Sequence, residues 1–375
     1  MSGLVKPKTV DISESNIAGL GTELEKKVRL DAAQTEAAWH GVGQKVETRV
    51  WRIEQFKVVA WPEKQYGMFY EGDSYIVLNT WKKPDAPTFY HDIYFWLGLE
   101  TTQDEAGTAA YKTVELDDFL GTLPVQHREV QGSESGAFLG LFKHFHTEKG
   151  GVDSGFNHVT AKEYRPRLLQ IRQNKTAPRG QGLIIREIPM AASSLNSGDV
   201  FVYDGGLVIH QWNGKASNGM ERSKAAEFVR TLSDSRAGKA PIKVSDEGDR
   251  DAKEFFDAIG GSASDVQPAD AVTDATATAA PKALYCLSDA SGSLTFTKKA
   301  EGVIKKDQFD TNDVFVLDGG SEVFVWIGAK ASADERKKGM AYALEYMKKH
   351  NRPMNIPVTL IREGGSEDVM ANFMN

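Results

Sequence analysis

Three pairs of acidic residues recur along the chain at matched spacing, and carboxylates of this kind either bind cations or cap helices. The pairs are Asp73 with Glu105, Asp199 with Glu221, and Asp313 with Glu335. Each Asp opens an apolar, strand-like run. Each Glu lies nine residues after the tryptophan of a Trp-x-Gly motif. Because both acids recur in each copy, we expect the Asp/Glu pair to have the same role in all three.

Two interpretations of the repeated Glu are open. Thr102, Asn218 and Ser332 each stand three residues before it, which is the spacing of a capping box, and an acid also suits the first turn of a helix. Alternatively the pair binds calcium, which takes about six to eight oxygen ligands from carboxylates and carbonyls. Each Asp follows a residue whose carbonyl is accessible, namely Gly72, Gly198 or Asn312. One Glu side chain is able to do both.

The spacing also predicts three tandem modules. Asp199 precedes Trp212 by 13 residues, and Asp313 precedes Trp326 by the same number. The first copy is ten residues longer, and the excess over 79–91 predicts a longer hairpin loop. We expect an N-terminal arm (1–45), module 1 (46–160), module 2 (161–260), a linker without aromatic residues (261–282) that lets module 3 move, and module 3 (283–375).

Each module alternates strand patterns with two helical segments. Long helices are predicted over 104–120, 218–232 and 332–349, and shorter ones over 135–145 and 251–259. Strands are predicted over 46–58, 125–130, 183–188, 242–244, 283–288 and 358–362. The fold class is therefore α+β, with a central mixed sheet between a long and a short helix in each module.

Composition limits the classes of function. A net charge of -7 argues against broad binding to nucleic acid, which needs a basic surface. The single cysteine, Cys286, excludes an intrachain disulfide and a cysteine-based zinc site. No secretory signal or transmembrane run is visible, so a cytoplasmic protein is expected.

Long motifs in register carry a family resemblance. They are Gly72-Asp-Ser-Tyr, Trp96-Leu-Gly, Thr102-Gln-Asp-Glu-Ala-Gly-Thr-Ala-Ala110, Val114-Glu-Leu-Asp-Asp-Phe-Leu120, His127-Arg-Glu-Val130 and Gly150-Gly-Val-Asp-Ser-Gly-Phe156. With them the sequence resembles the gelsolin superfamily, and in particular its three-repeat actin-severing members, severin and fragmin. The resemblance covers all three modules.

The resemblance implies calcium as the cofactor, with one site per module. Module 1 would use the carbonyls of Gly72 and Val152 with Asp73 and Glu105. The implied ligands of modules 2 and 3 are the Gly198 carbonyl, Asp199, Glu221 and Asp270, and then the Asn312 carbonyl, Asp313 and Glu335. Asp265 and Asp274 remain alternatives to Asp270.

A second kind of calcium site is implied in module 1. It would combine Asp117 with carbonyls near Thr122 and Pro124 and with a carboxylate of actin. The family often has Gly-x-Ala where this chain has Thr122-Leu-Pro124.

The resemblance also implies surfaces for actin. The long helix of module 1 would insert into the barbed-end cleft of actin, with contacts from Tyr111, Thr113, Val114, Asp117 and Asp118. Arg222 and Lys224 of module 2 would contact the filament side. The basic connection between modules 1 and 2 is either a solvated segment or a binding site, for the filament side or for phosphoinositide headgroups. Its basic residues are Lys162, Arg165, Arg167, Arg172 and Lys175.

The expected function is that of a calcium-activated protein that severs actin filaments, caps their barbed ends and nucleates assembly, and that is not an enzyme. One alternative is a protein that sequesters actin monomers or caps filaments without severing. Another is a metal-dependent hydrolase built on the Asp/Glu pairs, for which the sequence offers no adjacent base.

Overall fold

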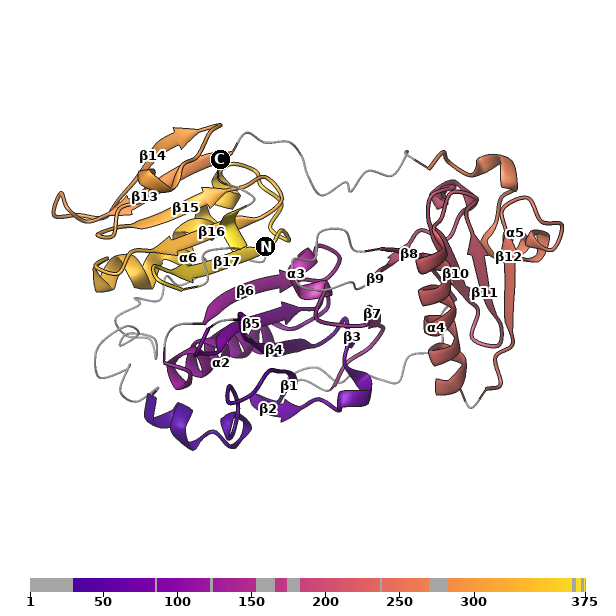
Figure 1. The fold of residues 1–375 in the computed structure, drawn as a ribbon, viewed down its shortest axis with the longest axis horizontal. Coiled ribbons are helices and arrows are strands. Elements are labelled where there is room, and N and C mark those ends of the chain that lie inside the picture. The colour runs from indigo at the N-terminus through magenta and orange to yellow at the C-terminus, as the bar shows by residue number, and fades with distance from the viewer. Residues whose placement is uncertain are drawn as a thin grey trace, which may run out of the picture.

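The computed structural model describes residues 30–84, 86–121, 124–152, 166–173, 183–236, 238–269, 282–365, 369–371 and 374. Within them the strands form two sheets, one of ten strands and one of seven, and the long helices lie against them (Figure 1). This is the α+β architecture predicted from the sequence. No helix of the described residues is both long and apolar enough to cross a membrane.

Module 1 contains the first seven strands. Its elements are η2 (Ala37–Trp39), β1 (Glu47–Glu54), β2 (Lys57–Ala60), η3 (Glu63–Gln65), β3 (Met68–Tyr70), β4 (Ser74–Trp81), β5 (Tyr90–Leu97), α2 (Gln103–Phe119), β6 (Val125–Val130), α3 (Gly136–Leu139) and β7 (His144–Glu148). The single strand predicted over 46–58 was wrong, because Gln55 and Phe56 take positive φ angles of 49° and 66° and turn the chain into a hairpin. The helix predicted over 135–145 is shorter and gives way to β7.

Modules 2 and 3 repeat one plan, in which an antiparallel meander is followed by a long helix and a parallel strand. Module 2 comprises β8 (Arg167–Gln173), β9 (Leu183–Ile188), η4 (Ala192–Ser194), β10 (Val200–Asp204), β11 (Ile209–Asn213), α4 (Gly219–Ser235), β12 (Ile242–Asp246), α5 (Ala252–Ile259) and η5 (Ala263–Asp265). The start of the linker predicted over 261–282 was wrong, because Val266 packs on the module 2 core and Gln267 pairs with Asn196. Module 3 comprises β13 (Ala283–Ser288), β14 (Thr295–Glu301), η6 (Lys306–Gln308), β15 (Val314–Asp318), β16 (Val323–Ile327), α6 (Ala333–Lys349) and β17 (Val358–Arg362).

The glycine of each Trp-x-Gly motif links the end of one central strand to the start of the neighbouring strand through a backbone hydrogen bond. The amides of Gly98, Gly214 and Gly328 donate to the carbonyls of the repeated Asp residues at 3.1, 3.0 and 3.0 Å. A Cβ at these glycines would meet the carbonyl two residues before the Asp at 2.2, 2.5 and 2.3 Å. Only glycine fits this approach. The motif therefore holds each acidic strand start beside the loop that leads into the long helix.

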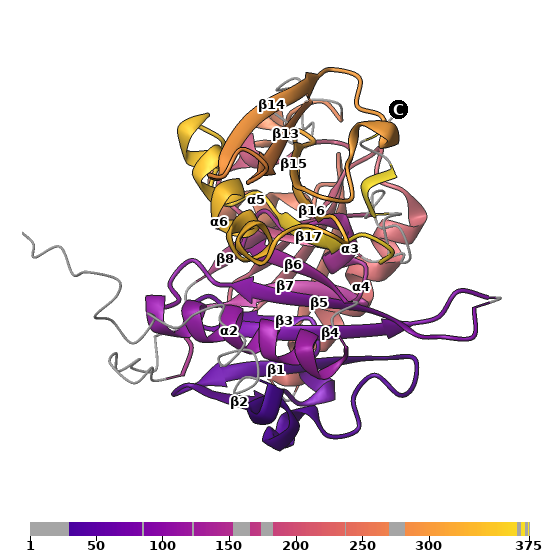
Figure 2. The same cartoon turned by 90° about the vertical axis from the view of Figure 1, so that its left-hand side faces the viewer.

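Modules 1 and 3 share the ten-stranded sheet. Strand β17 pairs antiparallel with β6, with Val358 opposite Arg128 and Thr359 opposite His127. Figures 1 and 2 show the two modules stacked edge to edge, with α2 and α6 on the same face of the joint sheet. The side chains of His127 and Thr359 meet at 3.0 Å, and Asn355 donates to Ser133 at 2.6 Å.

Modules 1 and 2 are joined through the seven-stranded sheet. Strand β7 pairs in parallel with β9, and β3 continues the sheet on the other side of β7. Arg167 of β8 bridges the two modules, because its guanidinium contacts Glu148 at 2.8 Å and Asp204 at 3.4 Å. Strands β3 and β7 lead directly into the acidic segment of module 1, so this segment is tied to the sheet of module 2.

Candidate metal centre

The Asp73 carboxylate of module 1 is fully buried where β3, β4 and β7 converge. Its Oδ1 accepts from the Val152 amide at 2.8 Å, and its Oδ2 accepts from the Tyr75 hydroxyl at 3.2 Å. The Arg52 guanidinium lies 3.4 Å from Oδ2. Burial raises the pKa of Asp73, although the Val152 amide and the Arg52 charge oppose the shift. A buried carboxylate of this kind is stabilised by any cation that reaches it.

Glu105 completes the pair from the first turn of α2. Its Oε1 is buried and has no hydrogen-bond partner among the described residues, whereas Oε2 accepts from the Thr101 hydroxyl at 3.3 Å. Burial raises the pKa of Glu105, and the nearby charge of Asp73 raises it further. An orphaned carboxylate oxygen beside a second acid fits a hard cation such as calcium. The pair is not a cluster of three or more metal-binding side chains, and the described residues contain no such cluster.

The backbone needed to complete the module 1 site lies beside Asp73. The Gly72 amide donates to the Gly150 carbonyl at 2.8 Å, and a Cβ at Gly151 would lie 2.3 Å from Asp73 Oδ1. Val152 is therefore next to the carboxylate, as predicted, but in this structure it presents its amide. The carbonyl roles of Gly72 and Val152 stay predictions.

In module 2 the Asp199 carboxylate is half-buried and held by two amides. Gln170 and Asn196 donate to its Oδ2 at 2.6 and 2.8 Å. Glu221 caps α4, since its Oε2 accepts a hydrogen bond from the Asn218 amide at 2.9 Å. In return, the Glu221 amide donates to Asn218 Oδ1. The capping interpretation is thus confirmed here, and it leaves the metal interpretation open.

The end of module 2 returns to its acidic pair. A Cβ at Gly198 would lie 3.0 Å from the Ala269 carbonyl, so the chain immediately before Asp270 reaches the site. Asp270 and the alternative Asp274 lie outside the described residues. Asp265 is engaged elsewhere, because its carboxylate accepts from the Ser262 amide at 2.8 Å.

Module 3 repeats the arrangement with a different neighbour. Asn312 is exposed, and Asp313 is half-buried with its Oδ2 3.5 Å from the Cys286 sulfur. Glu335 accepts from the Ser332 amide at 2.8 Å and from the Asp289 amide at 2.7 Å. Both Glu335 oxygens therefore have hydrogen-bond partners, so Glu335 must lose one of these hydrogen bonds before it can bind a metal ion.

A third repeated residue was missed by the sequence analysis. The residue after the strand that follows each long helix (β6, β12 or β17) accepts a hydrogen bond from the amide that follows the Trp-x-Gly glycine. These residues are Gln131, Glu247 and Glu363. The distances are 2.9, 2.9 and 2.7 Å. A polar acceptor directly after the predicted strands 125–130 and 358–362 was the available signal. These side chains fix the loop between the central strand and the long helix, and so position the repeated Glu.

Asp117, the candidate for the second kind of calcium site, is fully buried near the end of α2. Arg362 of β17 donates to its two oxygens at 3.3 and 3.0 Å. Burial raises the pKa of Asp117 to about 6, while Arg362 lowers it. Pro124 is buried and Thr122 lies outside the described residues. In this arrangement the cation beside Asp117 is therefore a guanidinium from module 3.

The candidate actin-facing residues of α2 differ in accessibility. Tyr111 is 43% exposed, Val114 is half-buried, and Thr113 is fully buried. Asp117 and Asp118 are buried as well. Only Tyr111 is open to a partner in this arrangement.

One exposed aromatic residue was not predicted. Phe56 sits at the positive-φ turn between β1 and β2 with 51% of its surface exposed. The sequence signal was a phenylalanine within the polar run Glu54-Gln-Phe-Lys57.

The predicted basic positions fall into three groups. Arg167 is buried and paired with acids, so it is not accessible to a lipid headgroup here, and Arg172 is half-buried. Lys162, Arg165 and Lys175 lie outside the described residues. Arg222 and Lys224 are half-buried on α4 and paired with Asp246 and Glu227, both at 3.3 Å.

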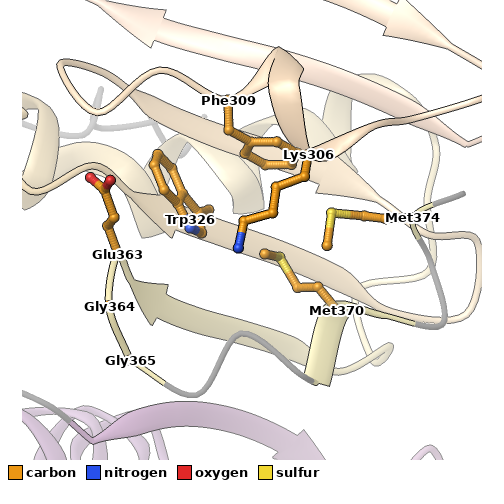
Figure 3. Close-up of a pocket in the computed structure, with 8 residues that line it drawn as sticks. All are labelled: Lys306, Phe309, Trp326, Glu363, Gly364, Gly365, Met370 and Met374. Atoms are coloured by element: carbon orange, nitrogen blue, oxygen red, sulfur yellow. The ribbon is translucent and has the colours of Figure 1, made fainter.

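A cavity of about 390 Å³ opens in module 3, away from the three acidic pairs. Figure 3 shows Phe309, Trp326, Met370 and Met374 around it, with the Lys306 ammonium pointing inward. Its one carboxylate, Glu363, is held by the Thr311 hydroxyl and the Ala329 amide. The cavity is mostly apolar and contains none of the predicted ligands.

Comparison with known proteins identifies the repeated unit. The family described as the gelsolin repeat matches residues 55–139, 185–253 and 296–364. The chain is 41% identical to gelsolin-like protein 2 of Lumbricus terrestris, over 97% of both sequences. It is 35% identical to severin of Echinococcus granulosus, over 99% of this chain and 98% of that one. It is also 41% identical to the actin depolymerising venom protein gelsolin 1 of Platymeris rhadamanthus, over 89% of each.

Proposed function

This chain belongs to the gelsolin family, and from that premise we propose that it is a calcium-regulated actin-binding protein of the cytoplasm. It severs filaments, caps their barbed ends and nucleates assembly. One relative is named as an actin depolymerising protein, which supports actin as the partner of this chain. Severing separates non-covalent contacts between subunits, so the protein is not an enzyme.

One observation carries the proposal, namely that module 3 is docked against the end of the module 1 helix that we propose to bind actin. Strand β17 is paired to β6, and Arg362 lies on Asp117 near the end of the candidate actin-binding helix. A protein that always bound actin would have no need of this docking. The arrangement therefore supports a resting state in which module 3 must leave before α2 and Asp117 meet actin.

The acidic pairs supply the means of release. Calcium, when bound, supplies a divalent charge that an Asp and a Glu of one module can share with nearby carbonyls. In module 1, Glu105 would hold such an ion through Oε1, which has no hydrogen-bond partner among the described residues, and would thereby tie the start of α2 to Asp73. Asp73 lies at the ends of β3 and β7, which belong to the sheet of module 2. A change at Asp73 is therefore transmitted to module 2 through this sheet.

Actin binding then proceeds from two surfaces. Module 2 docks on the filament side through basic residues that include Arg222 and Lys224. Module 1 inserts α2 between subunits through Tyr111 and Val114, with Phe56 as an additional apolar contact. Thr113 is fully buried, so we do not include it among the actin contacts. Asp117, released from Arg362, becomes free for the shared calcium site. Phosphoinositide binding by Lys162, Arg165, Arg172 and Lys175 remains a further proposal.

The direct experiment is fluorescence microscopy of preformed actin filaments mixed with the protein, with calcium and with chelator. Rapid appearance of breaks in calcium alone is the expected result. Loss of monomer from filament ends without breaks would favour the alternative, a sequestering or capping protein. No effect on filaments or monomers in either condition would contradict the actin proposal.

A further inference from the structure

One position in the first strand of each module faces the repeated Asp. The backbone register places Arg52, Gln170 and Cys286 opposite the residue two places after that Asp. The polar group of each of these side chains contacts the carboxylate of the repeated Asp. The distances are 3.4 Å from Arg52 to Asp73, 2.6 Å from Gln170 to Asp199, and 3.5 Å from Cys286 to Asp313. The three modules thus share the geometry but differ in the charge of the facing residue.

The module 1 residue is a cation that the fold holds firmly. The Arg52 guanidinium lies 4.7 Å from the centre of the Trp61 ring, and its Nε donates to Glu54 at 2.7 Å. Its partner Asp73 is fully buried, whereas Asp199 and Asp313 are half-buried. Arg52 is therefore not a loose surface side chain that moves away from Asp73 without losing other contacts.

The residues of modules 2 and 3 bring no charge to the same place. The Gln170 amide is neutral. The Cys286 thiol is buried and carries no positive charge in either protonation state. A cation approaching Asp199 or Asp313 meets no positive charge from this strand position.

We propose that this strand position sets the calcium response of each module, and that Arg52 acts as an internal cation that makes the module 1 site the last of the three to fill. The inference rests on the calcium-dependent function proposed above. A divalent ion at Asp73 must bind beside a fixed positive charge, and like charges repel at this range. Without metal, the same guanidinium offsets the charge of a buried carboxylate and keeps module 1 folded.

The test exchanges the residue between modules in the full-length protein. Arg52→Gln gives module 1 the residue of module 2, and Gln170→Arg makes the reciprocal change. Arg49→Gln is the matched control, because Arg49 lies on the same strand but contacts Glu47 rather than Asp73. Calcium affinity is read by displacement of Tb³⁺, with terbium emission excited through tyrosine. The Tyr75 hydroxyl contacts Asp73, while modules 2 and 3 carry Phe201 and Phe315 at that position. The part of the emission that Tyr75→Phe removes is therefore the part that reports module 1.

Arg52→Gln is expected to lower the calcium concentration that displaces half of the Tb³⁺ by roughly ten-fold or more, and Arg49→Gln to leave it unchanged. The thermal midpoint in chelator should fall for Arg52→Gln, and the gain in midpoint on adding calcium should grow. Gln170→Arg should shift the module 2 transition of a calorimetric calcium titration to higher concentration.

Unchanged or weaker calcium affinity in Arg52→Gln would overturn the inference, since Arg52 would then organise the site rather than oppose the ion. The absence of any calcium-displaceable Tb³⁺ signal or thermal shift in the unaltered protein would instead contradict calcium regulation itself. Severing that depends on calcium with unchanged affinity in Arg52→Gln would leave the proposed function standing and refute only the role of Arg52.

Discussion

Arg362 of module 3 and Asp117 of module 1 form an ion pair with a closest separation of 3.0 Å, although their sequence positions differ by 245. The carboxylate is fully buried and the arginine side chain is 30% exposed. The pair lies beside the strand pairing of β6 with β17, so it depends on the same docking of module 3. Arg362, which helps to dock module 3, is therefore paired with Asp117, a residue that the proposed actin-bound state would need.

Loss of this ion pair should lower the calcium needed for severing. Arg362→Gln removes one partner of a buried charge pair, which typically costs about 2 kcal/mol and here weakens the docked state. The calcium concentration for half-maximal severing is expected to fall on the order of ten-fold, with measurable severing in chelator. Filament microscopy over a calcium series gives the value. Arg230→Gln, an exposed arginine of module 2, serves as the control and should match the unaltered protein.

Docking of modules 1 and 3 should weaken as pH rises. Burial raises the pKa of Glu129 to about 8, and its module 3 neighbour Glu322 contributes to the shift. Burial raises the pKa of Glu322 to about 7. Both folded-state values exceed the ordinary value of a glutamate, so the protonated acids stabilise the docked state. That contribution is present at low pH and is lost as pH rises through about 7 to 8.

Small-angle X-ray scattering in chelator between pH 6 and pH 9 tests this dependence. The radius of gyration should increase with pH in the unaltered protein and change much less in Glu129→Gln. Glu301→Gln is the control, since Glu301 is an exposed partner of Lys298. An equally steep increase in Glu129→Gln would show that another group controls the docking.

The Trp-x-Gly glycine should be intolerant of a methyl group. In Gly328→Ala the new Cβ would lie 2.3 Å from the Thr311 carbonyl oxygen, and backbone atoms cannot move aside cheaply. We expect a loss of roughly 2 to 4 kcal/mol in the stability of module 3, measured by thermal unfolding. Gly107→Ala in α2 is the matched control. Nothing lies within 4 Å of its Cβ, so the same change should stabilise the helix by about 0.5 to 1 kcal/mol. Equal effects of the two changes would contradict the steric argument.

Local signals in the sequence predicted the repeated elements well. The helices expected over 104–120 and 332–349 are Gln103–Phe119 and Ala333–Lys349, because capping residues three before each Glu define their starts. The strand expected over 125–130 is β6 without change. The repeated spacing of Asp73 and Glu105 indicated a shared role, and in the structure the charge of Asp73 contributes to the raised pKa of Glu105. Their role as calcium ligands stays a prediction.

Contacts between distant segments could not be predicted in this way. The pairing of His127 with Thr359 spans 232 residues, and the local sequence of neither strand indicates which strand it pairs with. Strand β3 has only three residues, too few for a periodic pattern, yet it joins Asp73 to module 2. The positions of Arg52 and Arg362 next to acids likewise depend on strand register, which local sequence does not specify.

The central claim is that module 3 must separate from module 1 before filaments are severed, and a reversible cross-link tests it most directly. His127→Cys with Thr359→Cys places two cysteines at paired positions of β6 and β17 whose native side chains are in contact. Each single variant under the same oxidising conditions controls for the substitutions. In saturating calcium, the oxidised double variant should fail to sever filaments and should recover severing on reduction. Severing by the oxidised, cross-linked protein at the rate of the reduced protein would contradict the account.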